Sequence, residues 1–553
     1  MAEAVRTPRD DQKASLRKAT WGRPELDPIR SFEGKHIVLT GVTGFLGKVW
    51  LTMLLDFLPS VQRVSVVCRK KTGSSASERF AELVDTSPAL TPLRRRHGAR
   101  FRDFIDDKVR VIEGDGTKPL FGVSPSLVES ADLVANFAGL TDFEPDPAIA
   151  LTTNTLGALH AAELCAQTSG KRLMHVSTCY VAGRVSGEVA EHLDYGRSPL
   201  KRDFDPQSEL NAVRDTLDRC RTKRERIAQL MVRAERLGWP NVYTYTKGLA
   251  EHLLHSRVDI CTTTIRPSIV ESARTYPFAG WNEGINTSGP LVWLFSTSFR
   301  HFPSRPRHHF DVVPVDSVAR GALLIAAEML ENRAEDVYQL ASSDINPFTF
   351  RRAIELTNLG VRRMHANPEQ GFGQKVLRHL DVMPVSAKAT PLLGVQRMQQ
   401  AARQGVHWLR QLNLREELPT SVWNRFGERA EKHRKKQAQR LRNFDRTMNR
   451  VQEMLRLYRP FIHDHDYVFS TARIHGLNKR LSHEQQKRLG YDVGTIDWHD
   501  YWLNIHVPGL ERWCLPLLRG EKIPAEPIDL DDEERIHQIV SENSVAPAED
   551  RVR

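Results

Sequence analysis

A short apolar segment that runs directly into a glycine-rich turn is the feature that most constrains the fold of this chain. His36-Ile-Val-Leu-Thr40 has the composition of a buried strand, and Gly41-Val-Thr-Gly-Phe-Leu-Gly47 follows it immediately. In a strand–turn–helix unit, the first glycine permits the tight turn, the second lets a pyrophosphate approach the backbone, and the third lets the helix pack on the sheet. The free N–H groups at the start of that helix attract phosphate. We therefore expect a dinucleotide-binding unit here.

The following residues repeat this alternation of strand and helix. Strand patterns occur at residues 63–68, 109–112, 133–137, 172–176, 260–265 and 337–341, with helical stretches between them. Strands that alternate with helices form parallel sheets covered on both faces. The predicted class is therefore α/β, a Rossmann-type doubly wound parallel sheet with a C-terminal mainly helical domain.

The expected domain boundaries follow changes in composition. Residues 1–32 are polar and basic and are expected to form an N-terminal arm. Residues 33–364 would form the nucleotide-binding domain, with a helical insertion at about 205–238 where charged residues interrupt the alternation. Strand patterns become rare after that, so residues 365–524 would form the helical domain and residues 525–553 an acidic tail;.

The positive charge of the chain is concentrated in one stretch. The net charge is +11, and residues 401–460 contribute most of it. This favours an acidic partner such as a phosphate group or an anionic lipid. The aromatic residues there, Trp408 among them, have spacings typical of a helical core, so nucleic acid is not expected as a partner;. A helix that spans a bilayer needs about 20 consecutive apolar residues, and no apolar run in the sequence approaches that length. Any membrane contact is therefore expected to be peripheral.

The cysteines and histidines do not indicate a metal site. Six cysteines are scattered without a Cys-x-x-Cys pair, and the N-terminus lacks an apolar signal segment. Both features fit a reducing, cytoplasmic location. His463-Asp-His-Asp466 has residue types that bind metals, but no second ligand cluster accompanies it. Surface or capping roles explain it better, and no metal is expected.

The ends of the second and third strands bear on which dinucleotide is bound. An acidic residue after the second strand would favour the ribose hydroxyl of NAD, but here the strand runs into Arg69-Lys-Lys71;. A guanidinium suits a 2′-phosphate and so favours NADPH, although a solvated basic turn has the same composition. Asp115 and Gly116 follow the third strand, where Asp115 is placed to accept from the adenine amine or to stabilise a turn;.

Tyr243 and Lys247 are spaced to lie on one face of a helix;. A free tyrosine has a pKa of about 10, and a nearby ammonium is expected to lower it towards neutral pH. A hydroxyl at the end of the fifth strand would complete a catalytic set, with Thr178 as the first choice and Ser177 as its close competitor. Tyr245 has no lysine four residues later and is not expected to take part.

Together these residues resemble the extended short-chain dehydrogenase/reductases, and among them the fatty acyl-CoA reductases of the male-sterility type. The resemblance covers roughly residues 33–515 and is looser towards the C-terminus. Later segments also resemble that family: Thr264–Val270 with Pro277–Trp281, Asp311–Asp316, Val337–Ser343 with Asn346-Pro347, and Ile496–Tyr501.

The resemblance implies an NADPH-dependent reductase that converts a long-chain fatty acyl-CoA to a fatty alcohol through an aldehyde. Thr178, Tyr243 and Lys247 would be catalytic. The cofactor would lie along Gly41, Thr43, Gly44, Phe45, Leu46, Gly47, Arg69, Asp115, Gly116, Ala138, Gly139 and Pro267, and would also contact Tyr243 and Lys247. The pair Ala138-Gly139 departs from the alanine pair that is frequent in the family.

Other functions share parts of this pattern. A reductase that stops at the aldehyde, or that takes an acyl-carrier-protein thioester, would need the same residues. A sugar-nucleotide epimerase or dehydratase also uses a Tyr-Lys pair, but Arg69, the segment Pro277–Trp281 and the helical C-terminal domain count against it. The presence of Tyr243 and Lys247 disfavours a non-catalytic NADPH-binding protein.

Overall fold

The computed structural model describes residues 24–523, apart from 143, 286–287, 298–299, 365–380, 386–394, 413–415 and 417–418. The described residues form two compact units. The first contains the residues before 288 together with Asp311–Phe348 and the residues from Tyr467 onward. The second contains Ser288–Phe310 and Thr349–Asp466.

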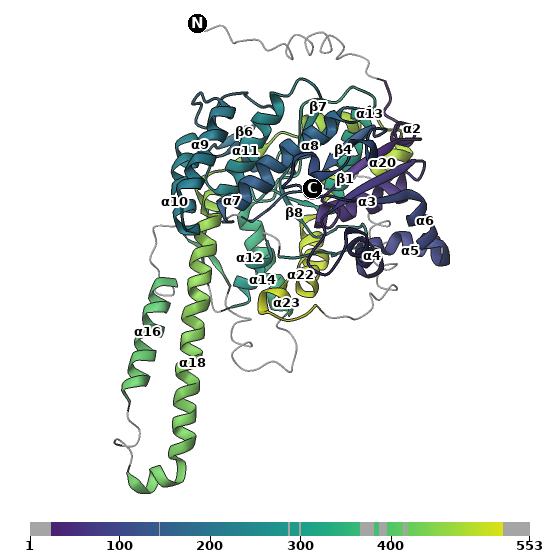
Figure 1. Cartoon of the computed structure of the whole chain (residues 1–553). Helices are drawn as coiled ribbons and strands as arrows, with labels where there is room; N and C mark the ends of the chain where they lie inside the picture. The colour runs from purple at the N-terminus through teal and green to yellow at the C-terminus, as the bar shows by residue number, and fades with distance from the viewer. Residues whose placement is uncertain are drawn as a thin grey trace, which may run out of the picture. The chain divides into compact units, whose positions relative to one another are not determined.

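A seven-stranded parallel sheet forms the centre of the first unit (Figure 1). Its strands lie in the order β11-β7-β5-β4-β1-β2-β3, and every neighbouring pair is parallel. The chain runs outward from β1 to β3, returns to β4, and then runs outward in the other direction, which confirms the doubly wound sheet. Ligands of such sheets bind at the switch point, here between β1 and β4. The strands are β1 (His36–Thr40), β2 (Arg63–Cys68), β3 (Val109–Glu113), β4 (Leu133–Asn136), β5 (Arg172–Val176), β7 (Cys261–Pro267) and β11 (Val337–Leu340).

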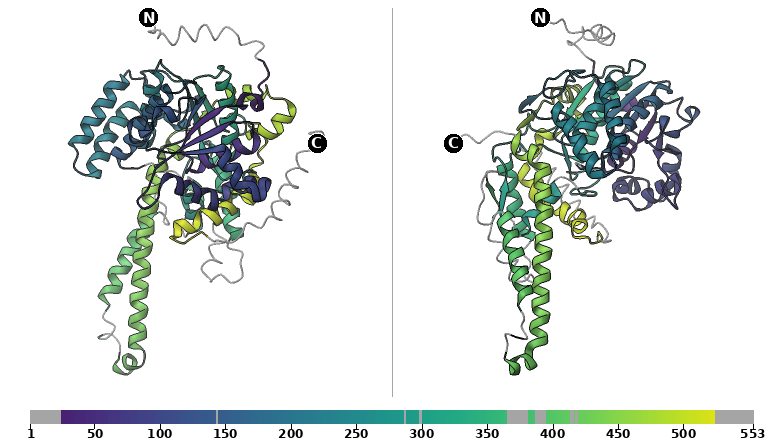
Figure 2. Two further views of the ribbon diagram at one scale, coloured as in Figure 1. Left: turned by 45° about the vertical axis from the view of Figure 1, so that its right-hand side comes forward. Right: turned by 60° about the vertical axis from the view of Figure 1, so that its left-hand side comes forward.

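Helices cover both faces of this sheet (Figure 2). α3 (Phe45–Phe57) and α13 (Val315–Leu330) pack together on one face, and α8 (Gly157–Ala166) and α11 (Val242–His255) on the other. Buried small and β-branched side chains, including Val38, Val134 and Ala161, form the core under α8 and α11. Because both faces are buried, the strands are apolar along their length rather than alternating.

The charged insertion is helical, as its pattern predicts. It forms α9 (Pro206–Arg219) and α10 (Lys223–Leu237), which share an apolar core with α11. Asp205 and Thr222 accept hydrogen bonds from the first turns of these two helices. The other helices of this unit include α4 (Ala76–Thr86), α5 (Thr91–His97), α6 (Phe101–Lys108), α7 (Pro147–Ala150), α19 (Ala472–Asn478), α20 (His483–Leu489), α22 (Val507–Trp513) and α23 (Leu515–Arg519).

The limits of the first unit differ from the predicted boundaries at both ends. Residues 24–32 were predicted to belong to an arm, but they contain the fully buried Leu26 and Phe32 and the helix α2 (Pro28–Phe32), which packs on α13. Residues 467–523 were predicted to belong to the helical domain, but β13 (Tyr467–Phe469) pairs with β6 (Gly187–Val189) of the first unit. Composition does not show these attachments, because they depend on a few buried side chains in polar surroundings.

The second unit is mostly helical and is dominated by a hairpin. Its two helices, α16 (Val395–Gln411) and α18 (Thr420–Arg459), lie side by side (Figure 2). Ala402, Ala438 and Met448 are buried in the hairpin, but 62% of the Trp408 surface is exposed, so the prediction that Trp408 belongs to a core is wrong. The unit also contains α12 (Ser288–Phe295), β9 (His301–Pro303), α14 (Phe350–Met364) and β12 (Met383–Val385). No helix in the described part of the chain is both long and apolar enough to cross a membrane.

The segment His463–Asp466 is engaged in contacts within the second unit. Asp464 lies 3.0 Å from the ring nitrogen Nδ1 of His463, and Asp466 accepts a hydrogen bond of 2.8 Å from the backbone N–H of His309. No group of three or more potential metal ligands occurs among the residues that the structure describes.

Candidate active site

The glycine turn lies at the carboxyl end of β1. Gly41 has φ +75°, and a Cβ on it would come within 2.5 Å of the Phe137 carbonyl carbon. A Cβ on Gly47 would overlap the carbonyl oxygen of Gly41, so α3 packs directly on the turn. Gly44 precedes α3, which has neither a side-chain cap among the described residues nor an acidic residue in its first turn. The start of α3 can therefore accept an anion.

The sheet brings Arg69 and Asp115 together at the ends of the adjacent strands β2 and β3. Asp115 accepts hydrogen bonds from the backbone and the hydroxyl of Thr117, at 3.0 and 2.9 Å. Partial burial opposes ionisation of Asp115, but these hydrogen bonds and the charge of Arg69 outweigh it and lower the pKa of the carboxyl group. Arg79 of α4 donates to the Arg69 carbonyl and brings a second guanidinium to this corner. Sequence reasoning missed Arg79, because only the return of α4 onto β2 places it there.

The loop after β4 connects the glycine turn to α11. Asn136, at the end of β4, is buried and accepts hydrogen bonds from the Thr40 hydroxyl (2.6 Å) and the Ala138 N–H (3.3 Å). Two residues later, a Cβ on Gly139 would lie 2.9 Å from Nζ of Lys247. The structure therefore places Ala138 and Gly139 between the glycine turn and the lysine.

Tyr243, Lys247 and Thr178 are all buried where α11 crosses the end of β5. A hydrogen bond joins the side chains of Thr178 and Tyr243, and the Thr178 hydroxyl also donates to the Pro267 carbonyl at 3.4 Å. The Ser177 hydroxyl is buried and has no hydrogen-bond partner among the described residues. The geometry therefore joins Thr178, rather than Ser177, to the tyrosine.

Burial is the main cause of the pKa shifts of Tyr243 and Lys247. It raises the pKa of Tyr243 to about 12, partly offset by the hydrogen bond with Thr178. It lowers the pKa of Lys247 to about 8, partly offset by the charge of Glu251. The sequence predicted that Lys247 would lower the pKa of Tyr243, but desolvation dominates, and the ammonium donates to the Val176 carbonyl at 2.9 Å. Tyr243 is therefore a phenol at neutral pH and can donate a proton.

Asn154 is a positioning residue that sequence reasoning missed. Its side chain accepts from the Leu140 N–H (2.8 Å) and donates to the Leu140 carbonyl (3.1 Å) and the Thr246 hydroxyl (3.2 Å). It therefore fixes the loop after β4 against α11. Asn154 lies in a π-helical turn, Leu151–Leu156, and such turns are frequent at functional sites;.

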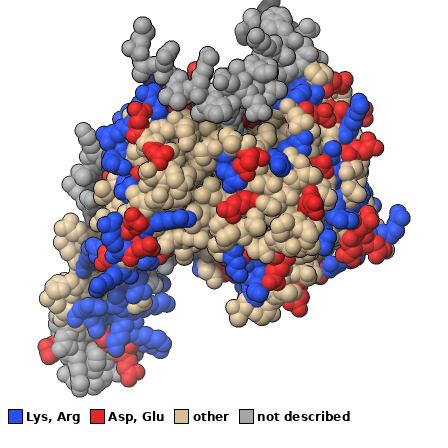
Figure 3. All heavy atoms as spheres, turned by 45° about the horizontal axis from the view of Figure 1, so that its top comes forward, with Lys and Arg blue, Asp and Glu red and all other residues tan. Residues whose placement is uncertain are grey.

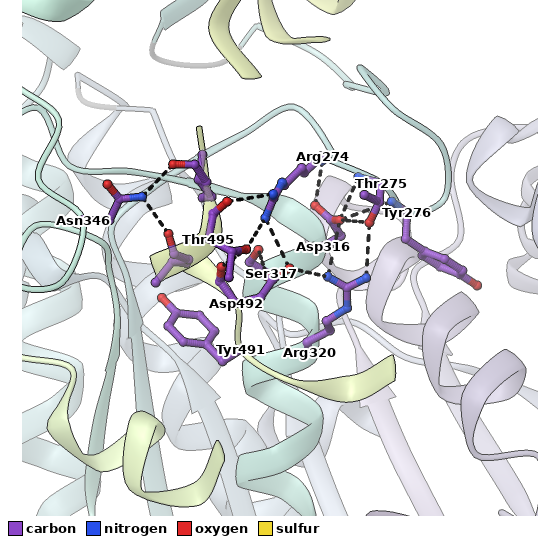
Figure 4. Close-up of polar contacts among 12 residues, drawn as sticks. Arg274, Thr275, Tyr276, Asp316, Ser317, Arg320, Asn346, Tyr491, Asp492 and Thr495 are labelled. Carbon is purple, nitrogen blue, oxygen red and sulfur yellow. Dashed lines mark hydrogen bonds and ion pairs between the residues drawn. The ribbon is translucent and has the colours of Figure 1, made fainter. Parts of the chain in front are cut away.

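A polar network fastens the C-terminal segment, residues 492–501, to the rest of the first unit (Figure 4). Asp316 is fully buried and accepts hydrogen bonds from the backbone N–H groups of Arg274, Thr275 and Tyr276 at 2.8, 3.0 and 3.2 Å. The Arg274 guanidinium donates to the Thr495 hydroxyl (2.8 Å) and reaches Asp492 at 3.4 Å. Asn346 donates to the carbonyls of Val493 and Ile496 at 3.0 and 2.9 Å. The later segments singled out in the sequence thus contact one another.

The same segment supports the loop that covers the start of α3. The Tyr501 hydroxyl donates to the Ser272 carbonyl at 2.7 Å. Further along this loop, the Trp281 ring lies 5.0 Å from the Phe45 ring, and Glu283 forms an ion pair with Lys48. The C-terminal segment therefore helps to hold the first turn of α3.

Comparison with known proteins identifies the family. A family model described as male sterility protein matches residues 39–322, more than half of the chain. The chain belongs to the male sterility protein family. A second model with the same description matches residues 432–516 of the chain. The resemblance predicted from the sequence is thus confirmed at the level of the family.

Several curated proteins similar to this chain are named fatty acyl-CoA reductases. "Fatty acyl-CoA reductase 2, chloroplastic" from Arabidopsis thaliana is 27% identical over 527 residues, which cover 88% of this chain and 79% of the relative. "Probable fatty acyl-CoA reductase 4" from the same plant is 27% identical, with 88% and 99% covered. "Alcohol-forming fatty acyl-CoA reductase" from Simmondsia chinensis is 28% identical over 357 residues, with 60% and 72% covered. The family match, these relatives and the parallel sheet together support an oxidoreductase with a short-chain dehydrogenase/reductase fold.

Proposed function

We propose that this protein reduces long-chain fatty acyl-CoA to fatty alcohol through an aldehyde, with NADPH as the reductant. The burial of Thr178, Tyr243 and Lys247 together, one loop away from the glycine turn, is the observation that carries this proposal. The relatives support the substrate class, since they are named fatty acyl-CoA reductases and one is named alcohol-forming.

The residues present fit a nicotinamide dinucleotide. The glycine turn approaches the neighbouring backbone too closely for a Cβ at Gly41, and the uncapped start of α3 suits the pyrophosphate;. Arg69, with Arg79 beside it, would hold the 2′-phosphate of NADPH;. The remaining contacts would come from Thr43, Gly44, Phe45, Leu46 and Gly47 at the phosphates, from Asp115 and Gly116 at the adenine, and from Ala138, Gly139, Tyr243, Lys247 and Pro267 near the nicotinamide ribose. When bound, the cofactor supplies the hydride.

The side chains of the protein would stabilise the charge that develops on the substrate and would donate the proton. The Thr178 and Tyr243 hydroxyls would donate hydrogen bonds to the substrate carbonyl oxygen and stabilise the negative charge that develops on it. The phenol of Tyr243, whose pKa is about 12, would give its proton to the aldehyde oxygen as the alcohol forms;. The Lys247 ammonium would then stabilise the phenolate until a proton from water restores it.

The stoichiometry of reduction tests the proposal. Purified protein is incubated with palmitoyl-CoA and NADPH, and NADPH oxidised is counted per CoA released while the lipid product is identified. Alcohol formation consumes two hydrides per thioester, so a ratio near two with fatty alcohol is expected. A ratio near one with aldehyde would replace the proposal with an aldehyde-forming reductase. Turnover with acyl-carrier-protein thioester alone, or with no thioester, would overturn the acyl-CoA assignment.

A further inference from the structure

The hairpin of the second unit carries the charge imbalance of the protein. α18 contains 12 Lys and Arg residues against 4 Asp and Glu residues, and α16 contains 3 Arg residues and no acidic residue. The two helices together therefore carry as much net positive charge as the whole chain, +11. Figure 3 shows Lys and Arg side chains gathered over this part of the surface.

Four of these cations form a row along one face of α18. Arg429, Lys432, Lys436 and Arg440 follow one another at helical spacing, and all four are exposed;. We call them the cationic row. It extends over about 16 Å of helix axis. None of the four forms an ion pair with another residue in the described part of the chain.

The acidic residues of the hairpin do not neutralise the row. Asp445 pairs with Arg403 of α16 at 2.9 Å, and Glu431 pairs with Arg434, whose guanidinium also donates to the Leu409 carbonyl of α16. These carboxylates therefore serve the packing of the two helices. Glu428 borders the row without an ion-pair partner among the described residues. The opposite face of α18 is left with an uncompensated line of positive charge.

The straight arrangement of the four cations, without aromatic side chains among them, favours one kind of anionic partner over others. Sites for single-stranded nucleic acid place aromatic side chains among the cations, and the row contains none;. A convex acidic protein would contact only part of a straight line of charges. A flat anionic surface can meet all four charges at once. Polybasic segments bind anionic lipid headgroups in this way, with about a five-fold gain in partition for each Lys or Arg near the surface.

We propose that the cationic row docks the protein peripherally on an anionic phospholipid bilayer, with α18 lying along the membrane surface. The row has no large apolar side chain to insert, so the attraction is electrostatic. Because salt screens charges over about 10 Å at 0.1 M ionic strength, the binding should weaken steeply as salt is added.

Vesicle co-sedimentation of the full chain tests this docking. Vesicles of phosphatidylcholine with phosphatidylglycerol are compared with vesicles of phosphatidylcholine alone, at low and at high salt. The row variant is R429Q/K432Q/K436Q/R440Q. The control R410Q/K435Q/R442Q/R446Q removes the same charge from the same hairpin outside the row. Circular dichroism checks that both variants retain their helices.

We expect the wild-type protein to bind only the anionic vesicles and to be released by salt. The row variant should lose about 100-fold or more in partition, and the control variant less than about ten-fold. Equal losses in the two variants would show that only net charge matters and would overturn the proposal. Two results with the wild-type protein, which need no variant, would also overturn it: no binding at low salt, or binding that survives high salt. Binding of RNA or of an acidic protein through the cationic row, without binding of vesicles, would show that the row serves another partner and would overturn the proposal. The assay involves no turnover, so its result is independent of the reductase activity.

Discussion

Nζ of Lys247 donates a hydrogen bond of 2.9 Å to the carbonyl oxygen of Val176, the last residue of β5. The lysine of α11 is thereby held to the strand that continues into Ser177 and Thr178. Gly139 also lies close to the Lys247 ammonium, because a Cβ added to Gly139 would come within 2.9 Å of Nζ. These two contacts of the Lys247 ammonium join the three segments that form the candidate active site.

The pH dependence of activity and stability should report Lys247. Burial lowers its pKa to about 8, whereas the unfolded value is 10.5. Between these values the unfolded chain binds more protons, so the contribution of Lys247 to the free energy of unfolding rises with pH across this range. Lys247 loses the ammonium charge that we propose for catalysis over the same range, so kcat/KM should fall above about pH 8. Urea unfolding and pH–rate profiles of the wild-type protein and Lys247→Met measure both. A kcat/KM that stays flat to about pH 10 would contradict the assignment.

Tyr243→Phe should abolish proton donation and leave the fold intact. We expect kcat to fall by about 10²–10⁴-fold with little change in NADPH affinity. Tyr245→Phe is the matched control, because the Tyr245 hydroxyl donates to the buried carboxylate of Glu209 in α9 rather than towards the candidate site. That variant should keep its kcat and lose about 1–3 kcal/mol in the free energy of unfolding. Equal losses of kcat in the two variants would be incompatible with the role given to Tyr243.

Thr178 and Ser177 can be separated by removing each hydroxyl. Thr178→Val keeps the shape of the side chain but removes the hydrogen bond with Tyr243, so kcat should fall by about 10²-fold or more;. Ser177→Ala removes a buried hydroxyl that has no partner among the described residues, and kcat should change by less than about three-fold;. Single-turnover rates with palmitoyl-CoA measure both, and the reverse order would move the role to Ser177.

Alanine substitutions at two glycines of the turn should mainly affect different properties, stability at Gly47 and cofactor binding at Gly44. Gly47→Ala places a methyl group on the Gly41 carbonyl oxygen, so we expect a loss of about 1–3 kcal/mol in stability;. At Gly44 the added Cβ would lie 3.3 Å from the same oxygen, so Gly44→Ala should fold with a smaller loss. Because Gly44 would face the pyrophosphate, that variant should instead bind NADPH more weakly. Thermal unfolding with and without NADPH separates the two effects, and a Gly47→Ala protein of unchanged stability would contradict the close packing of Gly47 on Gly41.

Arg69 should govern the preference for NADPH over NADH. Arg69→Ala is expected to lower kcat/KM for NADPH by about 10–100-fold, since hydrogen bonds to charged groups contribute about 1.5–3 kcal/mol. The value for NADH should hardly change. Lys70→Ala provides the control, because Lys70 already pairs with Glu113 at 3.1 Å. Steady-state kinetics with both cofactors measure the ratio, and a parallel loss with NADH would show that Arg69 acts on stability instead.

Several features of the site followed from the sequence because they depend on neighbouring residues. The apolar run His36–Thr40 and the glycines after it define a strand and a turn within a few residues. The spacing of Tyr243 and Lys247 places both on one face of any helix that contains them;. The alternation of strands and helices predicted the doubly wound sheet, because parallel strands need helical connections between them;.

Other features depend on contacts between distant segments, and only the tertiary structure decided them. Arg79 reaches Arg69 because α4 folds back on β2, and Asn154 reaches Leu140 and Thr246 through a π-helical turn. The residues from Tyr467 onward join the first unit through pairs such as Arg274 with Thr495. The direction of the Tyr243 pKa shift also differs from expectation, because burial, which depends on the whole fold, outweighs one nearby charge. The sequence by itself thus determined which reactive groups exist and in what local geometry. The tertiary structure decided which of them meet and how far each is removed from water.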